Sequence, residues 1–258
     1  MTTLRAKSLV VLYSVLSWTF ASSPLVAFEP PPLFSDNLEN GAGNWLTYPG
    51  ATPLEYVSTS TDPNGNHTPE GSFGLELTRP TDRIYHDVDL SSLPGTGVKL
   101  SLWFYDVLDT RPTNFEPFDI RNTTSSQVLG LGAFPQSANY QARILTAANG
   151  SVGPNWVLTP VPRSLGWHLF EIVQYRGAQA GTVDFYIDGI LGHHTTNAFD
   201  ATLDRIVLGL GFAGSNLQSG YVDDISLVAI PEPSTLLLGA MASAGLLWPM
   251  RRTNGRAF

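Results

Sequence analysis

The chain contains no cysteine among its 258 residues. Disulfides, thiol nucleophiles, cysteine-ligated zinc and iron–sulfur centres are therefore excluded. Lysine is almost absent as well, since Lys99 is the only one between residues 28 and 230. That stretch holds 21 Asp and Glu against 9 Lys and Arg, a net charge of −12. So acidic a surface repels phosphate backbones, and we expect no nucleic acid partner.

Long helical patterns are also missing, because 24 Gly and 19 Pro are spread through the sequence. This composition favours many short strands joined by turns. Residues 98–107 begin with strict alternation and become apolar on both faces at 103–105, as in a strand at the middle of a sheet. A first strand is expected around Phe34 and Leu38. Further strands are expected at 53–58, 72–77, 84–90, 118–122, 126–133, 140–146, 156–159, 167–175, 182–191, 204–211 and 221–228. The sequence predicts an all-β fold of two packed antiparallel sheets.

The clearest hairpin lies at 182–191, where Asp188-Gly189 supplies a tight reversal. Residues 166–172 and 183–189 resemble a pair of strands that recurs in laminin-G and concanavalin A-like jelly rolls. The resemblance implies a two-sheet jelly-roll sandwich over residues 33–229, preceded by a Pro-rich lead at 28–32.

The N-terminus has the layout of a secretory signal peptide. Arg5 and Lys7 precede an apolar run from Leu9 to Phe20, and small residues follow. We place the cleavage after Ala27, which makes residues 1–27 the signal peptide.

The C-terminus begins with Pro231-Glu232-Pro233, which cannot continue a strand because proline lacks an N–H. An uncharged run of fifteen residues follows from Leu236 to Met250, closed by Arg251 and Arg252. A helix of this length spans roughly 22 Å, short of the roughly 30 Å hydrocarbon core of a bilayer. It is therefore a marginal anchor, suited to brief retention.

This tail resembles the PEP-CTERM sorting signal of Gram-negative, exopolysaccharide-producing bacteria. The resemblance assigns residues 230–258 to the tail and 235–250 to a short transmembrane helix. It implies that an exosortase in the inner membrane binds the tail and cleaves it near the Pro-Glu-Pro box. The body would then reach the cell surface or the extracellular matrix. Two features depart from the pattern: Pro249 interrupts the helix, and the chain continues from Thr253 to Phe258.

Carboxylates near both ends of the predicted domain suggest a cation site. Asp36 and Glu39 lie near its start, and Asp223 and Asp224 lie near its end. If the first and last strands pair, these oxygens meet and could hold a structural Ca²⁺, as in similar carbohydrate-binding sandwiches. The alternative is an exposed acidic edge that discourages association between sheets. In a regular strand Asp223 and Asp224 face opposite ways.

No catalytic residues are assigned. The Glu-x-Asp-x-(x)-Glu tract of concanavalin A-like glycosidases is absent, and Glu116-Pro117-Phe118-Asp119 comes nearest. Its proline favours a turn over a catalytic strand. No Gly-x-Ser-x-Gly elbow is present, and the adjacent His193 and His194 cannot easily reach one metal.

Aromatic side chains are the remaining candidates, since sugar rings stack on them. Trp103, Tyr105, Trp156 and Tyr186 form a hypothetical glycan platform, whereas Trp45 and Trp167 are expected in the core. We expect a non-catalytic, exported surface or matrix protein that binds polysaccharide. The alternatives are a divergent glycoside-active enzyme on the same fold and a purely structural or adhesive protein.

Overall fold

The computed structural model describes residues 31–41, 43–59, 62, 64–69, 71–79, 81–90, 96–108, 115–125, 127–133, 137–145, 156–196, 202–209 and 220–231. The predicted signal peptide and the predicted transmembrane segment lie outside these residues, as do Glu232, Pro233, Arg251 and Arg252. Across the described ranges, no helix is long and apolar enough to cross a membrane.

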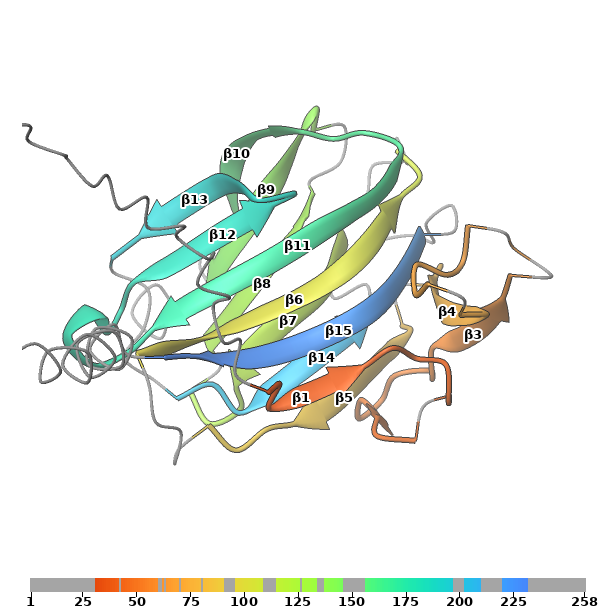
Figure 1. The fold of residues 1–258 in the computed structure, drawn as a ribbon, viewed down its shortest axis with the longest axis horizontal. Coiled ribbons are helices and arrows are strands. Elements are labelled where there is room, and N and C mark those ends of the chain that lie inside the picture. The colour runs from red at the N-terminus through yellow and green to blue at the C-terminus, as the bar shows by residue number, and fades with distance from the viewer. Residues whose placement is uncertain are drawn as a thin grey trace, which may run out of the picture.

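Two antiparallel sheets make up the fold (Figure 1). Sheet A has eight strands. In spatial order they are β13 (Ile190–Thr195), β12 (Val183–Ile187), β11 (Gly166–Tyr175), β6 (Gly97–Asp106), β15 (Gly220–Ile230), β4 (Phe73–Leu77) and β3 (Glu55–Ser58), with β1 (Phe34–Asp36) also paired to β15.

Sheet B has seven strands and lies behind sheet A in Figure 1. In spatial order they are β10 (Trp156–Pro162), β9 (Asn139–Leu145), β8 (Gln127–Ala133), β7 (Phe115–Asn122), β14 (Arg205–Gly209), β5 (Arg83–Asp87) and β2 (Leu46–Thr47). The described residues include a single 3-10 turn, η1 (Gly177–Gln179). The predicted all-β, two-sheet antiparallel fold is thus confirmed.

The core lies between the inner faces of the two sheets. Phe104 and Phe170 of sheet A are buried, with ring centroids 5.5 Å apart, and Phe118 of sheet B approaches Phe170 at 6.3 Å. Alternation along β6 places Val98 and Leu100 in this core and leaves Lys99 and Ser101 half-buried on the outer face. The period-2 pattern of the sequence therefore decides which side chains each sheet presents outward.

The structure settles three points of topology that the sequence raised. β6 lies in the interior of sheet A, between β11 and β15. Asp188 and Gly189 have φ values of 52° and 75° and join β12 to β13, as a tight hairpin turn requires. The first and last strands lie side by side, since β1 pairs with β15 through Ser35 and Ser226 (Figure 1).

Candidate functional site

A row of polar side chains crosses five strands of sheet A on its outer face. The row is in register from strand to strand, with one half-buried or exposed side chain from each of β12, β11, β6, β15 and β1. Its members are Tyr186, Glu171, Ser101, Ser226 and Ser35, and we call it the polar track. Four strand spacings make it about 19 Å long. The track thus offers hydrogen-bonding groups along a line, which suits an extended ligand.

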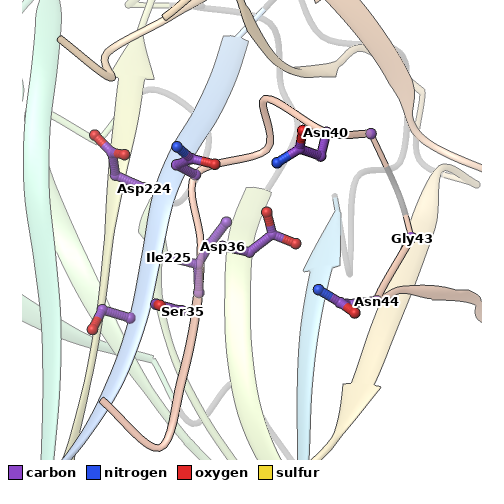
Figure 2. A pocket seen from close by; sticks show the side chains of 10 residues that line it. Ser35, Asp36, Asn40, Gly43, Asn44, Asp224 and Ile225 are labelled. Atoms are coloured by element: carbon purple, nitrogen blue, oxygen red, sulfur yellow. The ribbon is translucent and has the colours of Figure 1, made fainter. Parts of the chain in front are cut away.

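The track ends in a pocket of about 510 Å³ beside β1, which we call the edge pocket (Figure 2). Ser35 and Ser226 belong to both the track and the pocket. The remaining lining residues are Asp36, Asn37, Asn40, Gly41, Gly43, Asn44, Asp224 and Ile225. None of the lining side chains is basic, so the pocket offers amides, hydroxyls and carboxylate oxygens. Such a lining suits a ligand rich in hydroxyl groups.

Asp36 is one of two carboxylates that line the edge pocket, the other being Asp224. Figure 2 shows the side chain of Asp36 and the amides of Asn40 and Asn44 turned toward one space. Its Oδ2 accepts a hydrogen bond from the indole N–H of Trp45 at 2.9 Å, and its Oδ1 accepts one from the Leu38 amide at 2.8 Å. Trp45 is buried, as expected from the sequence. These bonds fix the carboxylate before any ligand arrives.

The other three predicted calcium ligands fasten a loop onto sheet A. Residues 62, 64–69, 71 and 72 of this loop are described, and we call it loop 62–72. The carboxylate oxygens of Glu39 accept the amides of Ser72 at 2.7 Å and Phe73 at 3.2 Å. Asp223, which is fully buried, accepts the amides of His67 at 2.8 Å and Thr68 at 3.1 Å. Burial raises the pKa of Asp223 to about 6, although these backbone N–H groups act in the opposite direction.

Asp224 binds the same loop, which a regular strand would not allow. The register of β15 shifts between Asp223 and Ser226, and Asp224 has a φ of 50°. This bulge brings the Asp224 carboxylate to the hydroxyl of Thr68 at 2.7 Å and to Nδ1 of His67 at 2.8 Å. The expectation that Asp223 and Asp224 serve opposite sides therefore fails because of the bulge.

As a group, the four carboxylates act as acceptors for the chain's own donors. Asp224 lines the edge pocket, but its carboxylate lies across β15 from that of Asp36 (Figure 2). Throughout the described part of the chain, no three or more His, Asp or Glu side chains gather in a way that could hold a metal ion. The geometry therefore favours a structural role, in which Glu39, Asp223 and Asp224 fasten the loop and Asp36 holds Trp45.

The predicted glycan platform is divided between the two sheets. Trp103 and Tyr105 share the outer face of sheet A with Tyr186, but the ring of His67 stacks on Trp103 at 3.9 Å. Tyr105 packs edge-on against Trp167 at 5.4 Å. Trp167, which the sequence placed in the core, is half-buried on this outer face because it pairs with Tyr105 in register. Of the platform residues on sheet A, only Tyr186 belongs to the polar track.

Trp156 lies on the outer face of sheet B, opposite Arg143, whose guanidinium is 6.0 Å from its ring centroid. On the same face, Arg143 Nη1 bonds Oε2 of Glu116 at 2.6 Å, and both side chains are buried. Oε1 of Glu116 has no hydrogen-bond partner. Burial is the main reason that the pKa of Glu116 is raised to about 7.

The proline of the Glu116-Pro117-Phe118-Asp119 segment does not make a turn. All four residues belong to β7, where the register with β8 shifts between Phe115 and Phe118. A bulge is one of the places where a strand tolerates proline. Consequently Glu116 and Asp119 both face outward from sheet B, and Asp119 pairs with Arg121 at 2.6 Å.

Sequence reasoning missed Ser101, Glu171 and Ser226 as parts of one row. Each shows an outward position through alternation within its own strand. Their alignment depends on register across three strands, which no local pattern in one sequence reveals. His193 and His194 lie on β13, where they alternate: His193 pairs with Phe185 and His194 with Asp184.

No known family model matches the chain, and no curated protein matches it. Solved structures do. An endo-1,3-beta-glucanase from Streptomyces sioyaensis is 15% identical, with 81% of this chain and 100% of that chain covered and a TM-score of 0.53. The cellulose induced protein Cip1 is 14% identical, covering 77% and 98%, with a TM-score of 0.48. The T. cruzi calreticulin globular domain is 8% identical, covering 84% and 94%, also with a TM-score of 0.48. The likeness to the glucanase shows a shared fold alone.

Proposed function

We propose that the protein binds a polysaccharide chain along the polar track and in the edge pocket, without cleaving it. The observation that carries the proposal is the in-register row of Tyr186, Glu171, Ser101 and Ser226, which leads into the amide-lined pocket. Its length of about 19 Å fits several sugar rings in line. The concanavalin A-like jelly roll implied by the sequence is a fold on which sugar binding is common, and a glucanase shares the two-sheet architecture.

Blocking the track tests the proposal. Ser101→Trp places a large side chain at the centre of the row, and we expect at least about a tenfold loss of affinity, or about 1.4 kcal/mol. The measurement is retention of the purified protein on a glycan array, followed by titration with the best-bound oligosaccharide. Leu165→Trp is the matched control, because Leu165 is exposed in the turn before β11 and away from the row. Equal losses in both variants would refute a site on the track.

The same proposal places the protein outside the cell. We propose that residues 1–27 direct export, and that an exosortase then releases the body from residues 230–258 at the inner membrane. The body becomes a component of the cell surface or extracellular matrix. The support is the order of motifs at the two chain ends. Deleting residues 232–258 should send the protein to the medium without exosortase processing, as measured by immunoblots of cell, membrane and medium fractions. An unchanged distribution would contradict this sorting route.

A second candidate is a glycoside-active enzyme, and one observation favours it. Glu116 is buried with an unpartnered oxygen and a pKa raised to about 7, and Asp119 faces the same way on β7. A carboxyl group with a pKa near 7 has the proton affinity of a general acid. Glu116 is 1% exposed, so catalysis would require a substrate to displace the chain that covers it. Release of reducing ends from a bound polysaccharide, abolished in Glu116→Gln, would establish this activity. If the protein neither binds nor cleaves any polysaccharide, a purely structural or adhesive role is the remaining alternative.

A further inference from the structure

The end of the polar track away from the edge pocket is built around one buried carboxylate. Asp184 Oδ1 lies 2.6 Å from Nδ1 of His194, and its Oδ2 lies 3.0 Å from the hydroxyl of Tyr175 and 3.4 Å from that of Tyr186. Asp184 is 8% exposed. We call these four residues the acceptor cluster.

Hydrogen-bond chemistry determines where the protons of the acceptor cluster point. An ionised carboxylate only accepts, so Nδ1 of His194 and both phenols donate to Asp184. Burial and the contact with Asp184 raise the pKa of Tyr175 to about 12 and raise that of Tyr186, so both phenols keep their protons at neutral pH. In neutral His194 the remaining lone pair is on Nε2, and this side chain is 52% exposed. With His194 in this neutral form, the cluster presents acceptors, and no donors, to a ligand.

The charge beside the acceptor cluster is negative. Glu171 lies opposite Tyr186 across the strand pair. Its Oε1 contacts the ammonium of Lys99 at 3.1 Å, so this site already holds one primary ammonium against a carboxylate. Glu171 and Asp184 carry two negative charges against the single charge of Lys99. The surrounding domain, with its net charge of −12, attracts cations over a longer range.

We propose that the acceptor cluster and Glu171 recognise the ammonium groups of an amino-sugar polysaccharide, one whose sugars carry free amines. This proposal rests on the proposed function, because it names the ligand class of the same track. An ammonium has three donors and no acceptor, which complements Nε2 of His194, the phenol oxygens and Glu171. The half-exposed ring of Tyr186 adds a cation–π contact. An N-acetylated sugar has no charge. Its amide offers one N–H donor in place of three and adds a carbonyl acceptor that finds no donor in the cluster.

Three β-1,4-linked hexasaccharides test the proposal on the purified protein: one of glucosamine, one of N-acetylglucosamine and one of glucose. Isothermal titration at neutral pH gives each affinity at low and at high salt. We expect the glucosamine chain to bind about tenfold more tightly at low salt, because ammonium–aromatic and ammonium–carboxylate contacts together exceed one power of ten. The preference should shrink as salt screens the charges.

Two variants locate the effect. His194→Lys puts an ammonium where the ligand's would lie, and Glu171→Gln removes one negative charge from the track. Both should reduce the preference for the glucosamine chain about tenfold, measured as the ratio of the glucosamine and glucose affinities of the same variant. Glu55→Gln is the matched control: it removes the same charge from a side chain that is 67% exposed on β3 of the same sheet. Circular dichroism confirms that each variant is folded.

The outcomes separate the two proposals. Equal affinity for all three chains, weakened by Ser101→Trp, would overturn amino-sugar recognition and leave polysaccharide binding in place. A preference for glucosamine that falls equally in Glu171→Gln and Glu55→Gln would also overturn it, because net charge alone would then account for the binding. Failure to bind any of the three chains at millimolar concentration would overturn amino-sugar recognition, and failure to retain any glycan on the array would overturn polysaccharide binding.

Discussion

The outer faces of the two sheets use similar residues in opposite ways. On sheet A, Lys99 and Glu171 form an ion pair whose side chains are 39% and 14% exposed. On sheet B, Arg143 and Glu116 form one whose side chains are 9% and 0% exposed. If a ligand separates Lys99 from Glu171, water can solvate the two charges. Water cannot reach Arg143 and Glu116, so separating that pair would leave two buried charges without a partner. The comparison indicates that burial, more than residue type, distinguishes a binding face from a structural one.

Parallel substitutions on the two faces should give the largest difference. Arg143→Met removes the partner of a buried carboxylate, and we expect a loss of about 3 kcal/mol in unfolding free energy. Lys99→Met removes the partner of a solvated one, and the expected loss is below about 1 kcal/mol. Urea unfolding of both variants at pH 7.5 measures the two values. Similar losses would show that the two faces do not differ in the way proposed.

The pH dependence of stability should come in part from sheet B. Glu116 has a folded pKa of about 7 against an ordinary value of 4.5. A carboxyl with a raised folded pKa contributes stability below its unfolded pKa and loses that contribution as pH rises through the folded value. Glu116→Gln should therefore reduce the fall in unfolding free energy between pH 5 and pH 8 by about 2 kcal/mol. An unchanged fall would mean that Glu116 is ionised in the native protein.

The sequence indicates which side chains face outward from a strand. It does not indicate how deeply those side chains are buried, which is what distinguishes the two outer faces. The alternation along 98–107 is consistent with the observed β6, where Lys99, Ser101, Trp103 and Tyr105 share one side. The burial of Glu116 could not be predicted, because its side chain packs against Gly130 on the neighbouring strand. Any residue other than glycine at position 130 would place its Cβ 1.7 Å from Oε1 of Glu116. The bulges at Pro117 and Asp224 likewise arise from pairing between distant segments. Local propensity carries no information about such contacts.

Loop 62–72 covers part of the outer face of sheet A, and the residues beneath it contribute to stability. Asp223→Ala leaves the amides of His67 and Thr68 without their acceptor, and we expect a loss of about 1–2 kcal/mol. Because the loop holds His67 on Trp103, the tryptophan fluorescence should shift to longer wavelength as well. Asp223→Asn, which keeps one acceptor oxygen, is the control and should recover part of the stability. If the two variants behave alike, the hydrogen bonds to the loop contribute little.

Calcium gives the smallest expected effect and the clearest test of the acidic residues on sheet A. A cation held by Asp36, Glu39, Asp223 and Asp224 would bind the native state alone, and chelation would lower the midpoint of thermal unfolding. The carboxylates instead accept hydrogen bonds from Trp45, Ser72, His67 and Thr68. These bonds exist without a metal, so we expect the midpoint to stay within about 1 °C when chelator or millimolar calcium is added. A fall of several degrees with chelator, reversed by calcium but not by magnesium, would mean that the ion replaces some of these donors. The loop would then be fastened by a metal, and Asp223→Ala should abolish the response to calcium.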